Sequence, residues 1–295
     1  MKIAKKSRNI LIVFVAILLT LYTYLTFIKE PVIEAEAAIL MDAQSGKVIY
    51  GKNENVPLAP ASMSKMMTEY IVLEKIHNGT LKWGDSVRIS PNAVNSIGAK
   101  INVRVGNRLT VRDLFHAMVI SSANNAAVAL AEHISKSEEN FTKLMNAKAK
   151  QLNLSNETHF VNATGLPNAQ HQESKMTVFD VATLAQHLLK TYPEVLDITK
   201  LTNYTLSYNG ATIMTTNKML DTSNDELYFQ GIDGLKTGFT DAAGYCFTGT
   251  AKQGEKRMIA VVMGTNEDTK RFIETKKLFS YGFNKIGSTF LNWQH

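Results

Sequence analysis

The sequence predicts an α+β fold, with an antiparallel sheet formed from N- and C-terminal strands and a helical lobe beside it. Three observations favour this fold: β-like runs near the start, apolar residues at helical spacing through the middle, and β-like runs again near the end. Of the 295 residues, 45% are hydrophobic and 20% are charged, which is a globular composition. We therefore expect one packed domain in the larger part of the chain.

The first two strands are predicted at Glu36–Asp42 and Lys47–Tyr50, on either side of a polar turn. A helix is predicted over Ser62–Ile76, where apolar residues recur at helical spacing. Further helices follow at Val111–Ile120, Ala123–Ile134, Glu138–Leu152 and Thr177–Leu189. The middle of the chain is therefore expected to form a helical lobe.

Strand patterns return near the end of the chain. The predicted strands are Gly234–Phe239, Tyr245–Ala251 and Met258–Met263, and the polar segment Gln253–Lys256 predicts a hairpin turn between the last two. A final helix is predicted from about Asp268 to Phe283.

The N-terminal segment predicts export. Four cations precede an uncharged, mostly apolar run over residues 10–28, which is long enough to cross the hydrocarbon core of a bilayer. The cations are Lys2, Lys5, Lys6 and Arg8. This charge asymmetry predicts a single-pass protein of the bacterial cell membrane with its main domain on the extracytoplasmic side. Because Ala35–Ala37 has the form of a signal peptidase site, a cleaved signal is the alternative.

The predicted domain organisation follows from these patterns. It comprises a short cytoplasmic segment (1–9), a transmembrane anchor or signal segment (10–28), a linker (29–35), a folded domain (36–284) and a C-terminal tail (285–295).

Charge and cysteine content exclude several classes of protein. The net charge of +6 is spread along the chain, so nucleic acid is not an expected partner. The single cysteine, Cys246, cannot form an intrachain disulfide. Histidines and cysteines form no H-E-x-x-H motif and no cluster, so neither a metal nor another cofactor is expected.

The string Ser62-Met63-Ser64-Lys65 is the strongest chemical signal in the sequence. A serine and a lysine three apart on a helix lie one turn from each other on the same face, so the amine can remove the proton of the hydroxyl. Ser62 is therefore a candidate nucleophile and Lys65 its candidate base. The plain alternative is a helix N-cap serine followed by a solvated lysine.

Two further strings follow in order. Within residues 36–284, an S-x-N string begins at Ser90, Ser122 and Ser207, and Ser122-Ala123-Asn124 is favoured because it lies just ahead of an alanine-rich helix. The third string, Lys236-Thr237-Gly238, lies on a predicted strand. Each string alone could be an N-cap or an edge-strand lysine, but all three in this order, on a helix, a loop and a strand, indicate one catalytic site.

With these motifs the chain resembles the serine D-alanyl-D-alanine carboxypeptidases. These are the low-molecular-mass penicillin-binding proteins of the S-x-x-K, S-x-N, K-T-G superfamily that includes the class A β-lactamases. The resemblance covers nearly all of residues 36–284 and extends to the strings over residues 38–42, 160–166, 234–240 and 243–246. It implies the β-lactamase/transpeptidase-like form of the α+β fold.

The resemblance implies three catalytic residues: Ser62 as the acylated nucleophile, Lys65 as its base and Ser122 as the relay of a proton to the leaving amine. A lysine can act as a base only if its amine is partly neutral, and burial and a nearby cation such as Lys236 favour this by lowering its pKa. The backbone N–H groups of Ser62 and Phe239 are implied to form the oxyanion hole.

The resemblance also implies a set of substrate-binding residues. Asn124 is expected to hold Lys65 and the substrate amide, and a cationic end of the site is expected to bind the free carboxylate of the substrate. For Arg271, a plain surface arginine remains the alternative. The whole set is Asn124, Lys236, Thr237, Gly238, Phe239, Thr240 and Arg271.

The implied function is removal of the terminal D-alanine from peptidoglycan stem pentapeptides through an acyl-enzyme on Ser62, with β-lactams as inhibitors. One alternative is a β-lactamase of the same fold, but the E-x-x-L-N string of that branch is absent between the second and third motifs. The other alternative is a membrane-anchored module that binds β-lactams without turning over peptide. Against it, the stretch before Ile10 is too short for an output domain.

Overall fold

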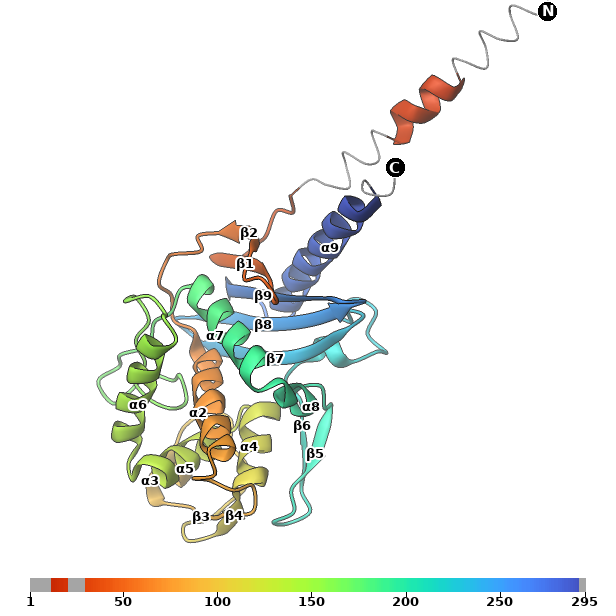
Figure 1. The fold of residues 1–295 in the computed structure, drawn as a ribbon. Coiled ribbons are helices and arrows are strands. Elements are labelled where there is room, and N and C mark those ends of the chain that lie inside the picture. Colours follow the sequence, from red (N-terminus) through yellow and green to blue (C-terminus); the bar gives the residue numbers. More distant parts are fainter. Residues whose placement is uncertain (1–11, 21–29, 292–295) are drawn as a thin grey trace, which may run out of the picture.

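The computed structural model describes residues 12–20 and 30–291, with side chains described up to residue 284. A five-stranded antiparallel sheet in the order β2-β1-β9-β8-β7 places strands from both ends of the chain side by side (Figure 1). The predicted α+β fold is therefore confirmed. The strands are β1 (Ala37–Asp42), β2 (Val48–Lys52), β7 (Ile232–Thr240), β8 (Gly244–Gln253) and β9 (Lys256–Thr265).

Strand β1 separates two hydrophobic cores. Ala37, Ile39 and Met41 belong to the core shared with the helical lobe, whereas Ala38 and Leu40 belong to the core on the other face. Successive side chains of a strand point to opposite faces of the sheet, so a strand covered on both faces is apolar throughout. The continuous apolar string that predicted this strand follows from that double burial.

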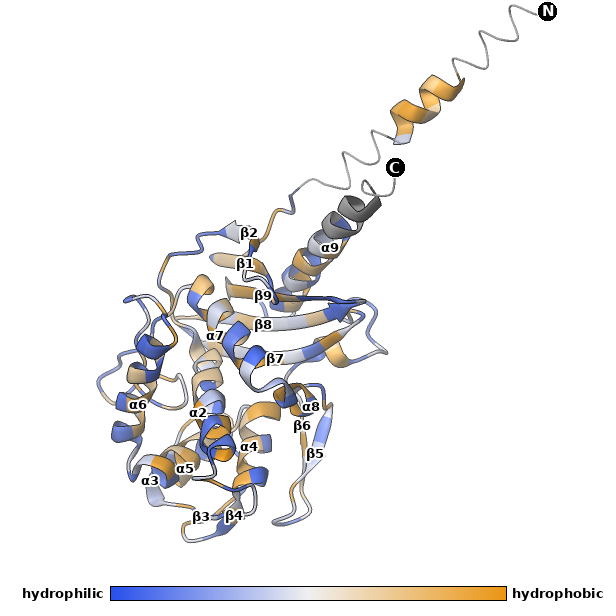
Figure 2. Ribbon diagram, in the orientation of Figure 1, coloured by the Kyte–Doolittle hydropathy of each residue, from blue (hydrophilic) through white to orange (hydrophobic). Residues whose placement is uncertain are grey.

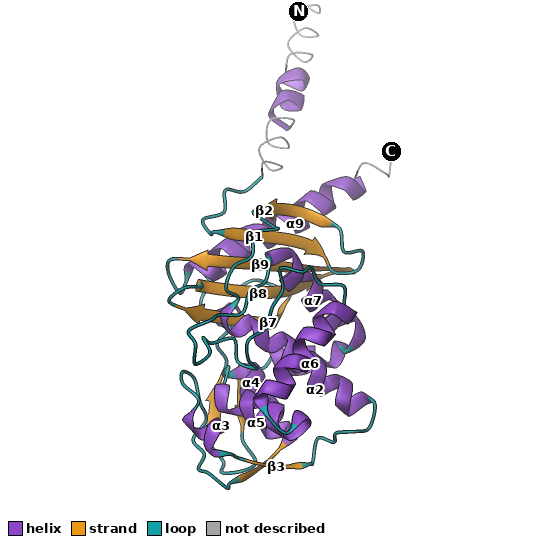
Figure 3. Cartoon of the chain, turned by 90° about the vertical axis from the view of Figure 1, so that its left-hand side faces the viewer, coloured by secondary structure: helices purple, strands orange, loops and turns teal. Residues whose placement is uncertain are grey.

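One face of the sheet is covered by a helical lobe built around α2 (Lys65–His77), as Figures 1 and 3 show. Helix α2 packs against four other helices of the lobe, and all residues from Lys65 to Leu73 are buried. Its polar residues Thr68 and Glu69 are therefore enclosed. The surrounding helices are α4 (Val111–Ile120), α5 (Asn124–Ser135), α6 (Glu138–Gln151) and α7 (Val178–Thr191).

Helix α9 (Lys270–Leu291) packs against β9, β8 and β1 and contributes Phe272 and Phe279 to the second core. The predicted end of this helix at Phe283 is wrong, because the helix continues to Leu291. Phe283 packs against the core, and Ile286, Phe290 and Leu291 continue the helical spacing of apolar residues beyond it. The predicted boundary between the domain and the tail therefore falls inside a helix.

Several short elements are absent from the sequence-based expectation because they are too short for a periodic pattern to reveal them. Two of them, α3 and the β3–β4 pair, lie at the far end of the helical lobe (Figure 1). The strands are β3 (Ser86–Arg88), β4 (Arg108–Thr110), β5 (Asn203–Thr205) and β6 (Thr212–Met214). The helices are η1 (Ala61–Ser64), α3 (Pro91–Asn95), η2 (Pro193–Val195), α8 (Leu196–Thr199) and η3 (Lys218–Leu220).

Residues 12–20 form a helix of mostly apolar side chains, all of them exposed (Figure 2). Across residues 12–20 and 30–291, no helix combines the length and the apolarity that a membrane crossing requires. The remainder of the predicted anchor over 10–28 lies outside the described residues, as do the predicted segment 1–9 and residues 292–295 of the predicted tail.

Candidate active site

Ser62 lies in the 3-10 turn η1, which leads directly into helix α2. Lys65 is the first residue of α2, and its Nζ donates a hydrogen bond of 2.8 Å to Ser62 Oγ. The lysine side chain is 0% exposed, whereas Ser62 keeps 9% exposure. The contact predicted from the S-x-x-K spacing is therefore formed, with the amine enclosed behind the hydroxyl.

The turn that carries Ser62 is fixed by two close backbone approaches. A Cβ atom on Gly165, which has a φ of +79°, would lie 1.9 Å from the carbonyl oxygen of Ala61. A Cβ atom on Gly238 of β7 would lie 2.8 Å from the Pro60 oxygen and 3.2 Å from the Ser62 nitrogen. Glycine at both positions therefore lets a loop and the edge of the sheet contact the nucleophile turn.

The environment of Lys65 favours its neutral form. Its Nζ donates a second hydrogen bond, of 2.8 Å, to the backbone oxygen of Thr164. Burial lowers the pKa of Lys65 well below its usual value, the charge of Lys236 lowers it further, and Glu69 opposes the shift. A lysine with a depressed pKa can accept the proton of a neighbouring hydroxyl.

A second lysine–serine pair is formed by the other two motifs. Lys236, on β7, places its Nζ 2.9 Å from Ser122 Oγ and 3.2 Å from the backbone oxygen of Thr237. Burial lowers the pKa of Lys236 to about 8, with Glu69 raising it and Arg271 lowering it. Ser122 lies between α4 and α5 with a φ of 60°, a left-handed conformation that is uncommon outside glycine and recurs at functional sites.

The structure separates Ser122 from the other two S-x-N strings. Ser90 Oγ accepts a hydrogen bond of 3.0 Å from the Ala93 N–H and caps α3. Ser207 Oγ donates a hydrogen bond of 2.6 Å to Asp113. Of the three serines, only Ser122 bonds to a lysine of another motif within the described chain.

The side chain of Asn124 differs from the expectation that it holds Lys65. Its Nδ2 donates a hydrogen bond of 2.6 Å to the backbone oxygen of Ile97, and the hydrogen bonds of the Lys65 amine go to Ser62 and Thr164 instead. Asn124 Oδ1 is buried without a partner among the described residues. Buried acceptors are nearly always satisfied, so this oxygen is available to a donor on a bound molecule.

The side chains at the end of strand β7 differ in whether they already have bonding partners and in how exposed they are. Thr237 Oγ1 lies 2.6 Å from Thr216 Oγ1. Thr240 Oγ1 donates to a Glu173 carboxylate oxygen at 3.1 Å, so this hydroxyl is already engaged. Phe239 is 45% exposed and its ring stacks on Tyr245 at 4.3 Å between centroids. Because β7 is an edge strand, N–H groups along its open side have no partner strand.

Arg271 is neither a surface residue nor a free cation. Its Nη1 donates a hydrogen bond of 3.0 Å to the backbone oxygen of Gly238, its Nη2 pairs with Asp268, and its side chain is buried. The guanidinium also lies 5.4 Å from the centre of the Tyr245 ring. The structure therefore places Arg271 behind β7, where it fixes the K-T-G strand.

Two groups next to Lys65 were not predicted from the sequence. Glu69, one turn further along α2, is 1% exposed, and burial raises its pKa to about 8 although the charges of Lys236 and Lys65 oppose the shift. Its spacing of four from Lys65 is a signal that could have revealed it. Thr164 acts through its backbone oxygen, which no side-chain pattern can reveal.

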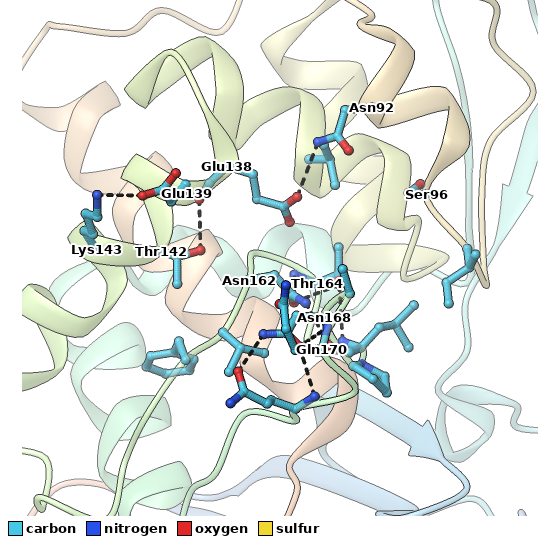
Figure 4. A pocket seen from close by; sticks show the side chains of 18 of the residues that line it. Asn92, Ser96, Glu138, Glu139, Thr142, Lys143, Asn162, Thr164, Asn168 and Gln170 are labelled. Atoms are coloured by element: carbon cyan, nitrogen blue, oxygen red, sulfur yellow. Dashed lines mark hydrogen bonds and ion pairs between the residues drawn. The ribbon is translucent and has the colours of Figure 1, made fainter.

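A cavity of about 850 Å³ lies between α6 and the loop that carries Asn162, Thr164 and Asn168 (Figure 4). It is lined by Ile97 and Thr164, whose backbone oxygens bind Asn124 and Lys65, but by none of the four paired side chains. Glu138 points into it and accepts a hydrogen bond of 3.4 Å from Asn92 Nδ2 (Figure 4). The cavity is therefore a neighbour of the reactive groups rather than their site.

An antiparallel sheet joined to a helical lobe, with a buried lysine bonded to a serine at their junction, defines the class of the active-serine penicillin-binding proteins. Within this class, the chain belongs to the D-alanyl-D-alanine carboxypeptidase family (Peptidase_S11), whose sequence model matches residues 25–267. The family resemblance inferred from the three motifs is therefore confirmed.

Named relatives and solved structures agree with this assignment. The D-alanyl-D-alanine carboxypeptidase DacF of Bacillus subtilis is 39% identical over 255 residues, which cover 85% of this chain and 63% of the relative. Penicillin-binding protein D2 of Listeria monocytogenes, solved in an ampicillin-bound form, has 36% identity and a TM-score of 0.75, covering 86% of this chain and 100% of that chain. PBP3 of Streptococcus pneumoniae has 36% identity and a TM-score of 0.80, and the match covers 85% of this chain and 74% of that chain. The chain thus spans about 63% of the length of DacF.

Proposed function

We propose that this chain is a serine-type D-Ala-D-Ala carboxypeptidase that removes the terminal D-alanine from peptidoglycan stem pentapeptides through an acyl-enzyme on Ser62. The observation that carries the proposal is the 2.8 Å hydrogen bond between the amine of the fully buried Lys65 and the hydroxyl of Ser62, a residue that retains 9% exposure. The name of DacF and the ampicillin-bound structure of the Listeria protein support it. β-Lactams are proposed as inhibitors that acylate the same serine.

Acylation begins when Lys65 takes the proton of Ser62 and the serine oxygen attacks the carbonyl carbon of the penultimate D-alanine. The bond to the nitrogen of the terminal D-alanine then breaks. Ser122 relays to that nitrogen the proton that Lys65 took from Ser62, so Lys65 is neutral again at the end of the step and Lys236 keeps its proton. The 2.9 Å hydrogen bond from the Lys236 ammonium to Ser122 Oγ holds the relaying hydroxyl in place. The products of this step are free D-alanine and an ester on Ser62.

The oxyanion of the tetrahedral intermediate is proposed to bind the backbone N–H groups of Ser62 and Phe239. Support comes from the close approach of Gly238 to the Ser62 nitrogen, which brings the open edge of β7 to the nucleophile. Loss of one such donor typically lowers the rate by about 10²- to 10³-fold.

The substrate carboxylate is proposed to bind Lys236 and Thr237, because this buried ammonium and hydroxyl lie together at the K-T-G strand. Asn124 is proposed to accept the substrate amide N–H with its unpartnered Oδ1. Arg271 and Thr240 are proposed to position strand β7 for substrate binding. Arg271 donates a hydrogen bond to the Gly238 carbonyl, and Thr240 donates one to Glu173.

Hydrolysis of the acyl-enzyme requires a base for the attacking water, and Lys65 is the group in position. Two carboxylates elsewhere around the site are engaged: Glu173 by Thr240 and Glu138 by the Ala163 N–H. Together with the absence of an E-x-x-L-N string between the second and third motifs, this favours a penicilloyl adduct that is hydrolysed slowly.

The proposal is tested by measuring D-alanine released from a stem pentapeptide, with and without penicillin. We expect release by the wild type, inhibition by penicillin, and no release by Ser62→Ala. Ser64→Ala is the matched control, because Ser64 is buried in the same turn and its hydroxyl has no partner among the described residues. Release by Ser62→Ala would refute the proposal, and rapid hydrolysis of penicillin would favour a β-lactamase.

We further propose that residues 10–28 anchor the protein in the cell membrane, with residues 36–284 as the catalytic domain on the extracytoplasmic side. The segments 1–9, 29–35 and 285–295 then form a cytoplasmic segment, a linker and a tail. The cationic N-terminal flank, the apolar composition and the exposed helix at residues 12–20 support the anchor. Stem peptides of the cell wall lie on that side of the membrane.

A further inference from the structure

Glu69 is a buried carboxyl within the group of charged residues on which the proposed chemistry depends. It follows Lys65 by four positions on α2, so the two side chains share one face of the helix. Glu69 is 1% exposed, and its Oε1 has no hydrogen-bond partner among the described residues. A buried carboxyl oxygen without a hydrogen-bond partner is costly and requires an explanation.

The explanation lies in the cations beside it. Lys65 is 0% exposed and Lys236 is 1% exposed, and the guanidinium of Arg271 adds a third positive charge near Lys236. Two buried amines without a counter-charge would destabilise the protonated form of each other. In the described part of the chain, Glu69 is the one carboxyl whose charge acts on both lysines.

The other ionisable groups around α2 and β7 have different partners. The charges that act on Glu69 are those of Lys236 and Lys65. The helices packed against α2 also carry His116 on α4, His133 on α5 and His187 on α7. Around α2, the bonded pairs are Asp113 with Ser207, Glu132 with Asn92, Glu138 with the Ala163 N–H, Lys148 with Glu74, and Asp180 with Ser155. Around β7, they are Asp197 with Lys200, Lys218 with Asp268, and Arg257 with Asp233.

The charge of Glu69 matters differently to the two lysines. Burial raises the pKa of Glu69 to about 8 and lowers that of Lys236 to about 8, so the carboxyl becomes anionic in the range where Lys236 would lose its proton. An anionic Glu69 raises the pKa of Lys236 and opposes that loss. Lys65, with a pKa well below its usual value, serves as the neutral base.

We propose that Glu69 is a positioning residue that supplies the counter-charge keeping the Lys236 ammonium protonated at alkaline pH while Lys65 acts as the neutral base. The inference rests on the proposed function, in which Lys236 binds the substrate carboxylate. Glu69 does not touch the substrate. It sets the upper pH at which the carboxylate site remains cationic.

The test is the pH dependence of acylation by a fluorescent penicillin, from about pH 6 to about pH 10, for the wild type and Glu69→Gln. We expect the acylation rate of the variant to decline with rising pH about one pH unit earlier than that of the wild type. In that alkaline range its rate should therefore be about tenfold lower. With a peptide substrate the loss is expected in KM, because Lys236 binds the carboxylate. Near pH 6 the two rates are expected to agree within about twofold.

Glu74→Gln is the matched control, since Glu74 lies on the same helix and pairs with Lys148 away from the lysine–serine pairs. Its pH profile should match that of the wild type, although it loses an ion pair. Glu69→Met, of similar length and without a titratable group, repeats the test if Glu69→Gln folds poorly by circular dichroism. Both folded variants are expected to show the lower alkaline limb.

Each outcome has a distinct meaning. A lower alkaline limb in the Glu69 variants, with an unchanged profile in Glu74→Gln, supports the inference. An alkaline limb that stays in place or moves to higher pH in a folded Glu69 variant overturns it and leaves the proposed function intact. A wild-type protein that penicillin fails to acylate at every pH overturns the proposed function itself.

Discussion

At the scale of the residue, the site depends on two lysines held in different states. Glu69 acts on both lysines, but for Lys65 the charge of Lys236 is the larger influence after burial and lowers the pKa further, whereas for Lys236 the charge of Glu69 is the larger influence and raises the pKa. Burial alone would neutralise both amines. The difference in their surroundings therefore assigns proton acceptance to Lys65 and carboxylate binding to Lys236.

Lys65→Arg tests the role of the base. A guanidinium keeps the positive charge but does not release its proton in the working range, so we expect the acylation rate to fall by about 10²- to 10⁴-fold. Because the pKa of Lys65 is lowered, the neutral amine of the wild type is present above that depressed value. The wild-type rate should therefore rise with pH well below the usual titration range of lysine.

Stopped-flow fluorescence with a reporter penicillin measures these rates. Lys200→Arg, at an exposed lysine paired with Asp197, is the control and should behave as the wild type. An acylation rate in Lys65→Arg equal to that of the control would remove Lys65 from the mechanism.

The side chains that meet at the site could be predicted from the sequence where spacing or motif order carries the information. The separation of three between Ser62 and Lys65 was enough to predict their contact on one helix turn. The orientation of Asn124 and the buried position of Arg271 could not be predicted, because they depend on the Ile97 and Gly238 carbonyls that the fold brings near. Backbone groups leave no trace in a side-chain pattern.

At the scale of the element, the nucleophile turn η1 depends on contacts from two other segments. The loop at Gly165 approaches it from one side and the K-T-G strand at Gly238 from another. Thr68 on α2 strengthens the first contact, since its hydroxyl donates a hydrogen bond of 3.0 Å to the Ala163 oxygen. The position of Ser62 is therefore set by three elements together.

Gly165→Ala tests this arrangement. A Cβ atom at this position would lie 1.9 Å from the Ala61 oxygen, so the loop or the turn must move. We expect acylation to slow at least about tenfold and stability to fall by more than the roughly 1–2 kcal/mol cost of a left-handed alanine. Urea unfolding and the acylation rate measure the two effects.

Gly79→Ala is the control, because Gly79 also has a positive φ, of +77°, but nothing within 4 Å of the added atom. It should lose only the cost of the left-handed backbone and keep its acylation rate. Equal losses of stability and activity in the two variants would contradict the steric account of η1.

At the scale of the whole molecule, the sheet divides the domain into two cores and its edge strand carries the K-T-G motif. Strands from both ends of the chain could be predicted to share one sheet, because β patterns flank a helical middle. The order β2-β1-β9-β8-β7 could not be predicted, since it depends on pairing between distant segments. The extension of α9 to Leu291 was likewise missed, although Ile286, Phe290 and Leu291 continue the helical spacing beyond Phe283.

The proposed anchor is tested on the whole chain. Removal of residues 1–29 is expected to release the protein into the soluble fraction while acylation by penicillin persists, because the domain over residues 36–284 contains both lysine–serine pairs. The full chain is expected in the membrane fraction, extractable by detergent. A full, uncleaved chain found in the soluble fraction would contradict the anchor.

Ser62 is proposed as the acylated nucleophile, and mapping the covalent adduct on the protein tests this role. The full chain is incubated with penicillin, digested and analysed by mass spectrometry. We predict one penicilloyl group on the peptide that contains Ser62, with fragmentation placing it on that serine, and no adduct in Ser62→Ala. An adduct on Ser122 or Ser64, or an adduct that persists in Ser62→Ala, would contradict the account.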